Sequence, residues 1–464
     1  MIKWIFCFLF YFIVKLSFCQ SPLIDWQMRY GGANSNYSYE SKQTLDGGFI
    51  IGGRSNSNIS GDKSENSKGG YDYWLLKIDA SGVKQWDKTL GGNDHEVFYS
   101  VIQTIDGGYA VCGTSYSETF GGDKSENNVG QWDYWIVKLS STGIVEWENT
   151  IGGDLVDEAT CIVQTIDGGF LVGGYSQSDI SGDKSENSKG ENDFWIVKLN
   201  FLGQVQWDKT IGGSNHDILK SVIQLDDGSY ILSGSSGSGI SGDKLENSRG
   251  FNDYWIVKIN NSATSIIWQK TIGGSEDENL YKTIRTSDNG FLLGGISYSN
   301  VSGDKSENSR GSADYWLIKL DFFGVLEWQK TIGGDDSDYL SSIIEIPTGG
   351  YLLSGTSASP ISGDKTVSLV GAFDGWVIKI NSLGSTIEWQ KGIGGSLGEG
   401  FNSISITSNN EYFLSGRGIG WSDRRGNSRS YCIGRSLGRG LSRGSCRSNT
   451  WSYCISRGLS RSYS

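Results

Sequence analysis

The sequence contains very little proline, histidine or methionine, with 3, 2 and 2 residues respectively in a chain of 464. Two histidines provide little material for the commonest general base and metal ligand, so any catalysis would have to rest on carboxylates. Glycine is abundant at 67 residues, but without accompanying proline it fits neither collagen nor a disordered low-complexity chain. Because 37% of the residues are apolar and 12% are aromatic, the composition predicts a folded, turn-rich protein.

Long hydrophobic runs are also scarce. The apolar run at residues 4–14 is shorter than the roughly 20 residues that a bilayer-spanning helix needs. It follows Lys3 and precedes small residues, which predicts a signal peptide over residues 1–19 that is cleaved before Gln20. Lipidation of Cys19 is an alternative. Either process predicts a secreted or cell-surface protein without a transmembrane segment.

The seven cysteines do not form a recognisable framework. Cys112 and Cys161 lie in apolar, strand-like segments, and their spacing resembles neither a zinc site nor a disulfide scaffold. We expect both to be single buried thiols.

The net charge of −12 is unevenly distributed along the chain. Residues 1–416 have a balance of −21, whereas residues 417–464 have a balance of +9, with ten arginines and no lysine. An acidic body repels phosphate backbones, so the sequence predicts no nucleic-acid partner for it.

A repeat with a period of 60 or 61 residues occupies most of the chain. Each unit reads approximately W-x-K-T-I-G-G, an acidic stretch, D-G-G-F/Y between two apolar segments, and then S-G-D-K-S-E-N followed by D-Y-W-I-V-K-L. The first tryptophan marks seven copies: Trp26, Trp86, Trp147, Trp207, Trp268, Trp328 and Trp389. The D-Y-W segment recurs six times, around Trp74, Trp135, Trp195, Trp255, Trp316 and Trp376. The seventh copy lacks this segment.

The apolar segments of a unit are short, rich in β-branched and aromatic residues, and separated by glycine-containing turns, which predicts four strands per repeat. The D-G-G sequences, such as Asp46-Gly47-Gly48, are hairpin signals. We therefore predict an all-β fold, a β-propeller of about seven four-stranded blades over residues 20–416, with the last blade incomplete. A linear β-solenoid is the main alternative, although its coils are usually shorter than 60 residues. The repeated tryptophans are expected to pack blade against blade.

Residues 417–464 follow neither the spacing nor the sequence motifs of the repeat. The segment is rich in Arg, Gly and Ser with few aliphatic residues, so it cannot bury enough surface to fold. The preferred explanation is a frame-shifted reading of the missing seventh blade, and a genuine disordered tail is the alternative. A basic arm that stacks aromatic side chains on a polyanion is a third hypothesis.

The D-G-G-Y/F, S-G-D-K-S-E-N and D-Y/F-W-I-V-K-L elements resemble the repeats of secreted β-propeller proteins of Bacteroidetes, which often end in a type IX secretion sorting domain. The resemblance covers about 390 of the 464 residues. It implies an exported or surface-displayed propeller, generally without assigned chemistry. The end of this chain departs from that pattern because it has no recognisable sorting domain.

The S-G-D-K-S-E-N loops are the candidate cation sites. Oxygen-bearing side chains at loop positions 1, 3 and 5, with a later Asp, are of the kind that Ca²⁺ gathers. A polar loop held by turn hydrogen bonds and Lys-Glu pairs explains the pattern equally. The candidate calcium ligands are Asp62, Ser64, Asn66, Asp72, Asp123, Asp133, Asp183, Asp193, Asp304 and Asp314.

Acidic residues also follow each Gly-Gly, and in a propeller they would lie on one rim. They could form paired carboxylates for glycoside hydrolysis, or simply a solvated acidic surface. Because their identities change from copy to copy, no single blade stands out. These clusters are Asp94 and Glu96, Asp157 and Glu158, residues 276–278, and Asp335, Asp336 and Asp338.

All of the notable residues repeat, whereas an active site would need an asymmetric set. We therefore predict a secreted or surface-exposed, non-enzymatic, monomeric propeller that serves as a binding or adhesion platform for an extracellular glycan or surface protein. The alternative is a secreted glycan-processing enzyme that uses rim carboxylates. Calcium is the only cofactor that the sequence suggests.

Overall fold

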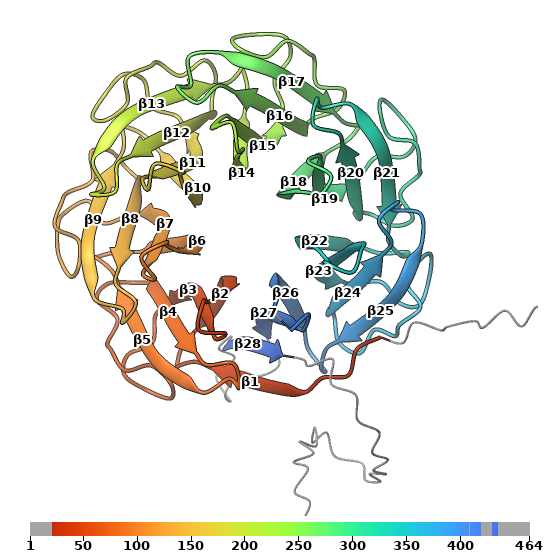
Figure 1. Ribbon diagram of the computed structural model, residues 1–464, viewed down its shortest axis with the longest axis horizontal. Coiled ribbons are helices and arrows are strands. Elements are labelled where there is room, and N and C mark those ends of the chain that lie inside the picture. The colour runs from red at the N-terminus through yellow and green to blue at the C-terminus, as the bar shows by residue number, and fades with distance from the viewer. Residues whose placement is uncertain (1–20, 408, 419–428, 435–464) are drawn as a thin grey trace, which may run out of the picture.

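The computed structural model describes residues 21–407, 409–418 and 429–434. These residues form 28 β-strands and no α-helix. The antiparallel sheets are arranged radially around an open centre, as in a β-propeller (Figure 1). The all-β propeller predicted from the repeat is therefore confirmed.

Six sheets each contain four consecutive strands. The first three are β2 (Asn36–Gln43), β3 (Phe49–Ser55), β4 (Asp72–Ile78) and β5 (Lys84–Leu90); β6 (Glu96–Gln103), β7 (Tyr109–Ser115), β8 (Asp133–Leu139) and β9 (Val145–Ile151); and β10 (Asp157–Gln164), β11 (Phe170–Ser176), β12 (Asp193–Leu199) and β13 (Val205–Ile211). The next three are β14 (Asp217–Gln224), β15 (Tyr230–Ser236), β16 (Asp253–Ile259) and β17 (Ile266–Ile272); β18 (Glu278–Arg285), β19 (Phe291–Ser297), β20 (Asp314–Leu320) and β21 (Leu326–Ile332); and β22 (Asp338–Glu345), β23 (Tyr351–Ser357), β24 (Asp374–Ile380) and β25 (Ile387–Ile393).

A further four-stranded sheet joins the two ends of the described chain. It has the order β1 (Trp26–Tyr30), β28 (Arg429–Gly434), β27 (Tyr412–Gly418) and β26 (Glu399–Ile406). The prediction that the last blade is incomplete is wrong, because β28 supplies its third strand and β1 supplies its fourth. This pairing closes the ring and covers an edge that would otherwise expose unpaired backbone groups.

The D-Y-W strands form the centre of each blade. In β8, β12, β16 and β20 every residue is buried, as expected for strands covered on both faces. Trp135 is fully buried, and its ring centroid lies 5.0 Å from that of Tyr73 in the preceding blade. The Tyr73 hydroxyl also donates to the backbone carbonyl of Trp135 at 3.2 Å. These contacts confirm that the repeated tryptophans pack between blades.

The predicted D-G-G hairpins are confirmed as well. Gly47 has a φ of 81°, a conformation that costs glycine little. The Asp46 carboxylate forms a 2.8 Å ion pair with the buried ammonium of Lys77. This turn connects the first and second strands of its blade, and the ion pair ties it to the third strand.

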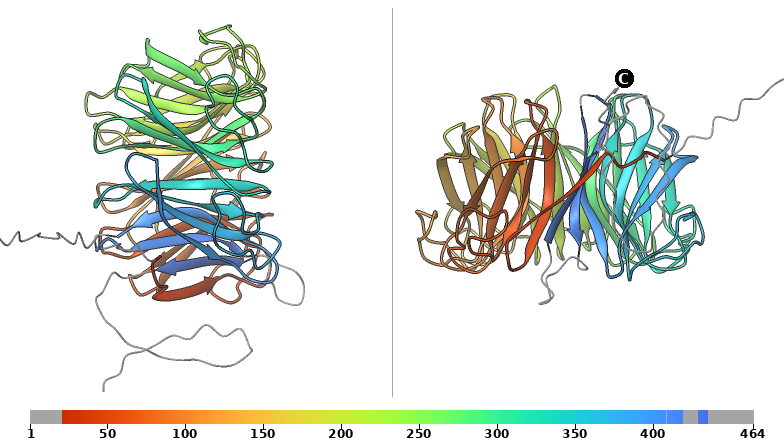
Figure 2. Two further views of the ribbon diagram at one scale, coloured as in Figure 1. Left: turned by 90° about the vertical axis from the view of Figure 1, so that its right-hand side faces the viewer. Right: turned by 90° about the horizontal axis from the view of Figure 1, so that it is seen from below.

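Strands run between the two faces of a disc, which Figure 2 shows from the side. We call the face where the innermost strands β2, β6, β10, β14, β18, β22 and β26 begin the upper rim, and the face with the D-G-G turns the lower rim. The innermost strands surround the centre of the ring (Figure 1). Each of them has a β-bulge at the same place, for example between Ser38 and Glu40.

Candidate functional site in the central channel

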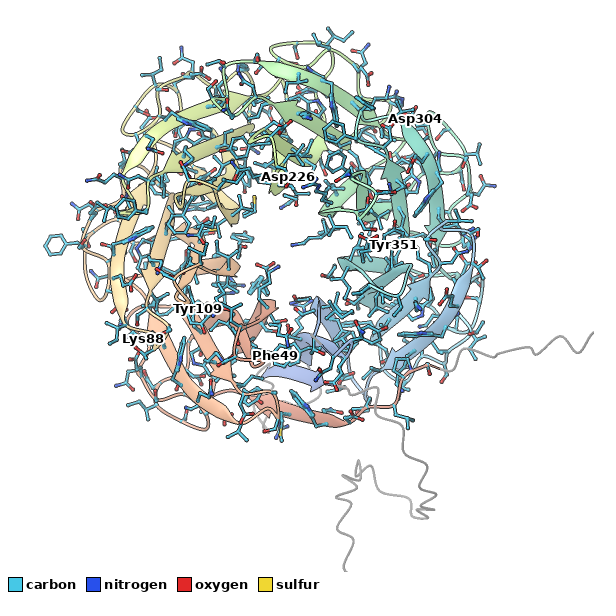
Figure 3. The ribbon with its side chains drawn as sticks, viewed as in Figure 1. Phe49, Lys88, Tyr109, Asp226, Asp304 and Tyr351 are labelled. Carbon is cyan, nitrogen blue, oxygen red and sulfur yellow. The ribbon has the colours of Figure 1, made fainter. Side chains whose placement is uncertain are left out.

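The central channel contains a cavity of about 560 Å³ that all seven innermost strands line. Side chains project from these strands toward the open centre (Figure 3). The cavity is of the size that small-molecule sites have. Three further cavities lined by described residues are smaller, with volumes of about 30, 100 and 10 Å³.

The bulged residue of each innermost strand lines this cavity. Bulges re-aim side chains and are common beside functional sites. This position differs from blade to blade. In blade order it carries Tyr39, Tyr99, Thr160, Lys220, Tyr281, Ser341 and Asn402.

Aromatic side chains gather on one side of the upper channel. The Arg54 guanidinium lies over three tyrosine rings, 5.4 Å from the centroid of Tyr37, 5.6 Å from that of Tyr39 and 4.9 Å from that of Tyr71. The ring of Tyr99, on the next blade, lies edge-on to Tyr39 with 6.3 Å between centroids. Such cation–π and aromatic contacts hold the rings in place and present a pre-formed apolar wall.

Glu158 connects this aromatic wall to the third blade. Its side chain accepts hydrogen bonds from the hydroxyls of Tyr99, at 3.3 Å, and Tyr175. Burial, and then the negative charge of Glu158, raise the pKa of both tyrosines, so they remain neutral donors at physiological pH.

Glu40 is the acidic residue of the cavity lining. It accepts a 2.7 Å hydrogen bond from the Ser100 hydroxyl and a 3.0 Å hydrogen bond from the Val101 amide. Burial alone would raise its pKa, but the ammonium groups of Lys42 and Lys282 lower that pKa to about 2. Glu40 is therefore a permanent anion in the channel.

The structure places the predicted calcium ligands in separate hydrogen-bond networks. Asp62 accepts from the Gly31 amide at 2.9 Å, and Asn66 accepts from the Ile59 amide at 3.0 Å. The Ser64 amide donates to Asp87 at 2.9 Å. Within the described ranges, no group of three or more His, Cys, Asp or Glu side chains is arranged to hold a metal ion.

The first aspartate of each loop instead joins neighbouring blades. Asp123 accepts a 3.1 Å hydrogen bond from the Gly91 amide of the preceding blade and forms an ion pair with Lys68. Asp183 and Asp304 accept from the equivalent glycines, at 3.2 and 3.1 Å, and Arg249 pairs with Asp304 at 2.8 Å.

The later aspartate of each loop holds its own loop closed. Asp72 accepts 2.7 Å hydrogen bonds from the Ser67 hydroxyl and the Lys68 amide. Asp133, Asp193 and Asp314 accept from the corresponding backbone amides, and all four carboxyl groups are fully buried. These contacts account for the loop sequence without a cation, and calcium binding stays a prediction of the sequence.

The acidic clusters after Gly-Gly do not form a uniform solvated rim. One member of each cluster begins an innermost strand and is fully buried, including Glu96, Asp157, Glu278 and Asp338. The Asp157 carboxylate, for example, accepts a 2.7 Å hydrogen bond from the Gly153 amide. The buried members therefore do not belong to a solvated acidic rim, because their carboxyl groups are enclosed beside the Gly-Gly backbone.

The channel residues were not predicted from the sequence. The predicted sites consist of residues that recur between repeats, whereas the channel side chains differ between repeats. The signal that could have found the bulge position is its variation between copies, where Tyr, Thr, Lys, Ser and Asn replace one another within the strand.

Cys112 and Cys161 are free and buried, as predicted. Burial raises the pKa of the Cys161 thiol to about 11, so this thiol is unreactive at neutral pH although it borders the cavity. The predicted signal peptide, residues 1–19, lies outside the described residues. So does most of the predicted disordered or frame-shifted tail, residues 417–464; the exceptions are the last two residues of β27 and the strand β28.

The described residues include no helix that is long and apolar enough to cross a membrane. Fold and site together define a β-propeller with a polar, tyrosine-rich central channel.

Comparison with known proteins adds little to this description. No protein-family profile matches the chain. The Regulatory protein FlaEY of Caulobacter vibrioides is 22% identical over 382 residues, a match that covers 76% of this chain and 39% of FlaEY, so the chain spans about two fifths of that relative. The Pan2 WD40 domain of Neurospora crassa has a TM-score of 0.45 at 9% identity, covering 88% of this chain and 90% of that one. Hydrazine synthase of Kuenenia stuttgartiensis has a TM-score of 0.47 at 10% identity, covering 83% and 94%. At these values the similarities carry no argument about chemistry.

Proposed function

We propose that this protein is a non-enzymatic binding platform that holds its ligand in the central channel, at the aromatic wall of the upper rim. The observation that carries this proposal is the bulge position of the innermost strands, where one asymmetric set of side chains converges on a cavity of about 560 Å³.

The chemistry of the wall favours a ligand with apolar faces and many hydroxyl groups. Tyr39 and Tyr99 present ring surface, and the Ser341, Ser342 and Asn402 side chains add hydrogen-bonding groups to the same cavity. A glycan offers both kinds of surface. We therefore propose an extracellular glycan as the ligand and, from residues 1–19 and the resemblance of the repeats, an exported or surface-displayed monomer.

Binding of fluorescent oligosaccharides to the purified full chain tests this function. We expect at least tenfold weaker binding by Tyr99→Ala, because the ring contact with Tyr39 and the Glu158 hydrogen bond are lost together. Phe323→Ala is the matched control, because this aromatic side chain is exposed at the lower rim. Equal binding by all three proteins would overturn the assignment to the channel.

The glycan-processing alternative is tested on the same samples. Glu158 is the acidic residue of the notable clusters that contacts the channel tyrosines. Release of reducing sugar by the native protein, and its loss in Glu158→Gln, would overturn the non-enzymatic assignment. Retention of glycan without turnover supports it.

A further inference from the structure

The channel has the opposite charge to the protein that contains it. The chain carries a net charge of −12, yet the cavity lining has four cationic side chains and one acidic one. The acidic residue is Glu40, and the cations are Lys42, Lys220, Lys282 and Arg417. Walls of low dielectric strengthen such a field, so the channel attracts anions even though the body repels them.

Two of the lysines compete for a single carboxylate oxygen. Lys42, on the same strand as Glu40, places its ammonium 2.9 Å from Glu40 Oε1. Lys282 lies on β18, in a blade that does not adjoin that of β2, and its ammonium reaches across the channel to 3.4 Å from the same oxygen. Repulsion by Lys42 is the largest influence on Lys282 and lowers its pKa. One carboxylate therefore neutralises only part of the charge of this pair.

Lys220 leaves a further positive charge in the cavity. It lies on β14, in the blade next to that of Lys282, and occupies the bulge position. Lys220 is half-buried, and among the described residues no hydrogen bond or ion pair reaches its ammonium group. Burial lowers its pKa, and the negative charge of Glu158 offsets that effect only in part. An anionic ligand would give this charge a direct partner.

We propose that the channel binds an oxyanion of its ligand, a carboxylate or a sulfate, through the ammonium groups of Lys220 and Lys282. This inference rests on the proposed binding function and narrows it to acidic glycans. An oxyanion at this point satisfies Lys220 and offers Lys282 a second negative partner, which relieves its repulsion with Lys42. The tyrosine wall contacts the sugar rings, and the lysines select sugars that have acidic groups.

Probes that have similar shapes but different charges show how much the charge of the ligand contributes to binding. We would titrate the full chain with trigalacturonate, with its neutral methyl ester and with a sulfated disaccharide, at low and high salt. The expected result is at least tenfold tighter binding of trigalacturonate than of its ester, with the difference lost at high salt. Binding of the sulfated probe in addition would identify a general oxyanion site, and its absence a carboxylate-selective one.

Two variants identify the groups responsible. Lys220→Gln keeps the length and polarity of the side chain but removes its charge, and we expect it to abolish the preference for the acid over the ester. Lys209→Gln is the control, because Lys209 lies in the preceding blade, on its outer strand β13, and pairs with Glu186 at 2.7 Å. We expect the control to bind as the native protein does.

The outcomes distinguish a failure of the oxyanion site from a failure of the proposed glycan-binding function. Equal binding of acid and ester, still sensitive to Tyr99→Ala, would overturn the oxyanion site and leave the glycan-binding channel intact. Failure of every probe to bind would overturn both. A preference for the acid that survives Lys220→Gln and Lys282→Gln would place the anion elsewhere and overturn the assignment to these lysines.

Discussion

The phenyl rings of Phe49 and Phe413 stack face to face, with 3.8 Å between their centroids and an angle of 14° between their planes. Phe49 begins β3 of the first blade and Phe413 lies in β27 of the last. Phe413 is fully buried. Residues separated by most of the sequence therefore form the apolar contact between the first and last blades of the ring.

Phe413→Ala should destabilise the whole protein. Truncating a buried phenylalanine costs about 3–5 kcal/mol, and here the cavity would open at the junction that joins the ends of the ring. Chemical denaturation followed by tryptophan fluorescence measures the change. Phe323→Ala, at an exposed hairpin, is the control and should change the free energy of unfolding by less than about 0.5 kcal/mol. Similar unfolding curves for the two variants would contradict this role.

Most of the ring could be predicted from the sequence, because each repeat buries the same side chains in the same order. Trp135 and its equivalents are recognisable as interface residues from their recurrence alone. The closing strand β28 could not be predicted in this way. Its register pairs Gly418 with Arg429, the position at which other blades pair Ser55 with Asp72. Strand pairing is made by backbone groups, so a strand can form where the side-chain pattern has been lost.

The channel was harder to predict for a different reason. Lys282 and Glu40 lie on strands of different blades, and nothing in the sequence indicates that they meet across the ring. The candidate calcium ligands illustrate the reverse error. Asp62 and Asn66 are close in sequence, but their oxygens accept from different backbone amides. Spacing along the sequence therefore indicates neither that Lys282 approaches Glu40 nor that the oxygens of Asp62 and Asn66 bind separate amides.

The loop aspartates predict a measurable stabilisation between blades. Asp123→Ala removes the hydrogen bond from the Gly91 amide and the ion pair with Lys68. Hydrogen bonds to charged groups contribute about 1.5–3 kcal/mol, so we expect a loss of that order in the free energy of unfolding. Glu118→Ala removes an exposed carboxylate and serves as the control, with an expected change near zero. Equal stabilities of the two variants would show that the contacts of Asp123 with Gly91 and Lys68 contribute nothing to the free energy of unfolding.

Calcium provides a separate test of the same loops. Because the loop oxygens already accept hydrogen bonds within the protein, we expect the melting temperature to be the same in excess Ca²⁺ and in chelator. Differential scanning calorimetry makes the comparison, with Mg²⁺ as a control for ionic strength. A Ca²⁺-specific rise would follow from preferential binding to the folded state and would restore the calcium hypothesis.

Buried carboxyl groups at the blade interfaces should make the protein more stable in mild acid than at slightly alkaline pH. Burial raises the pKa of Glu96 to about 8, with the neighbouring charge of Asp72 adding to the effect, and burial likewise raises that of Asp133 to about 7. The folded protein therefore binds more protons than the unfolded chain between about pH 4.5 and 8, and stability falls as the pH rises through this window. Each such group contributes a slope of up to about 1.4 kcal/mol per pH unit.

This slope should reverse at higher pH. Burial lowers the pKa of Lys63 and Lys244 to about 8, so above that pH the unfolded chain binds more protons and stability recovers. Melting temperatures measured from pH 4.5 to 10 should therefore pass through a minimum near pH 8.

Glu96→Gln tests which groups cause the decline. The first blade carries Asn36 at the equivalent position, fully buried, so an amide is tolerated there. The variant cannot ionise, and we expect its melting temperature to fall less between pH 5 and 8 than that of the native protein. Glu118→Gln, at an exposed site, should reproduce the native slope. A native melting temperature that rises steadily from pH 5 to 8 would contradict the account, because it would require the unfolded chain to bind more protons than these buried carboxyl groups allow.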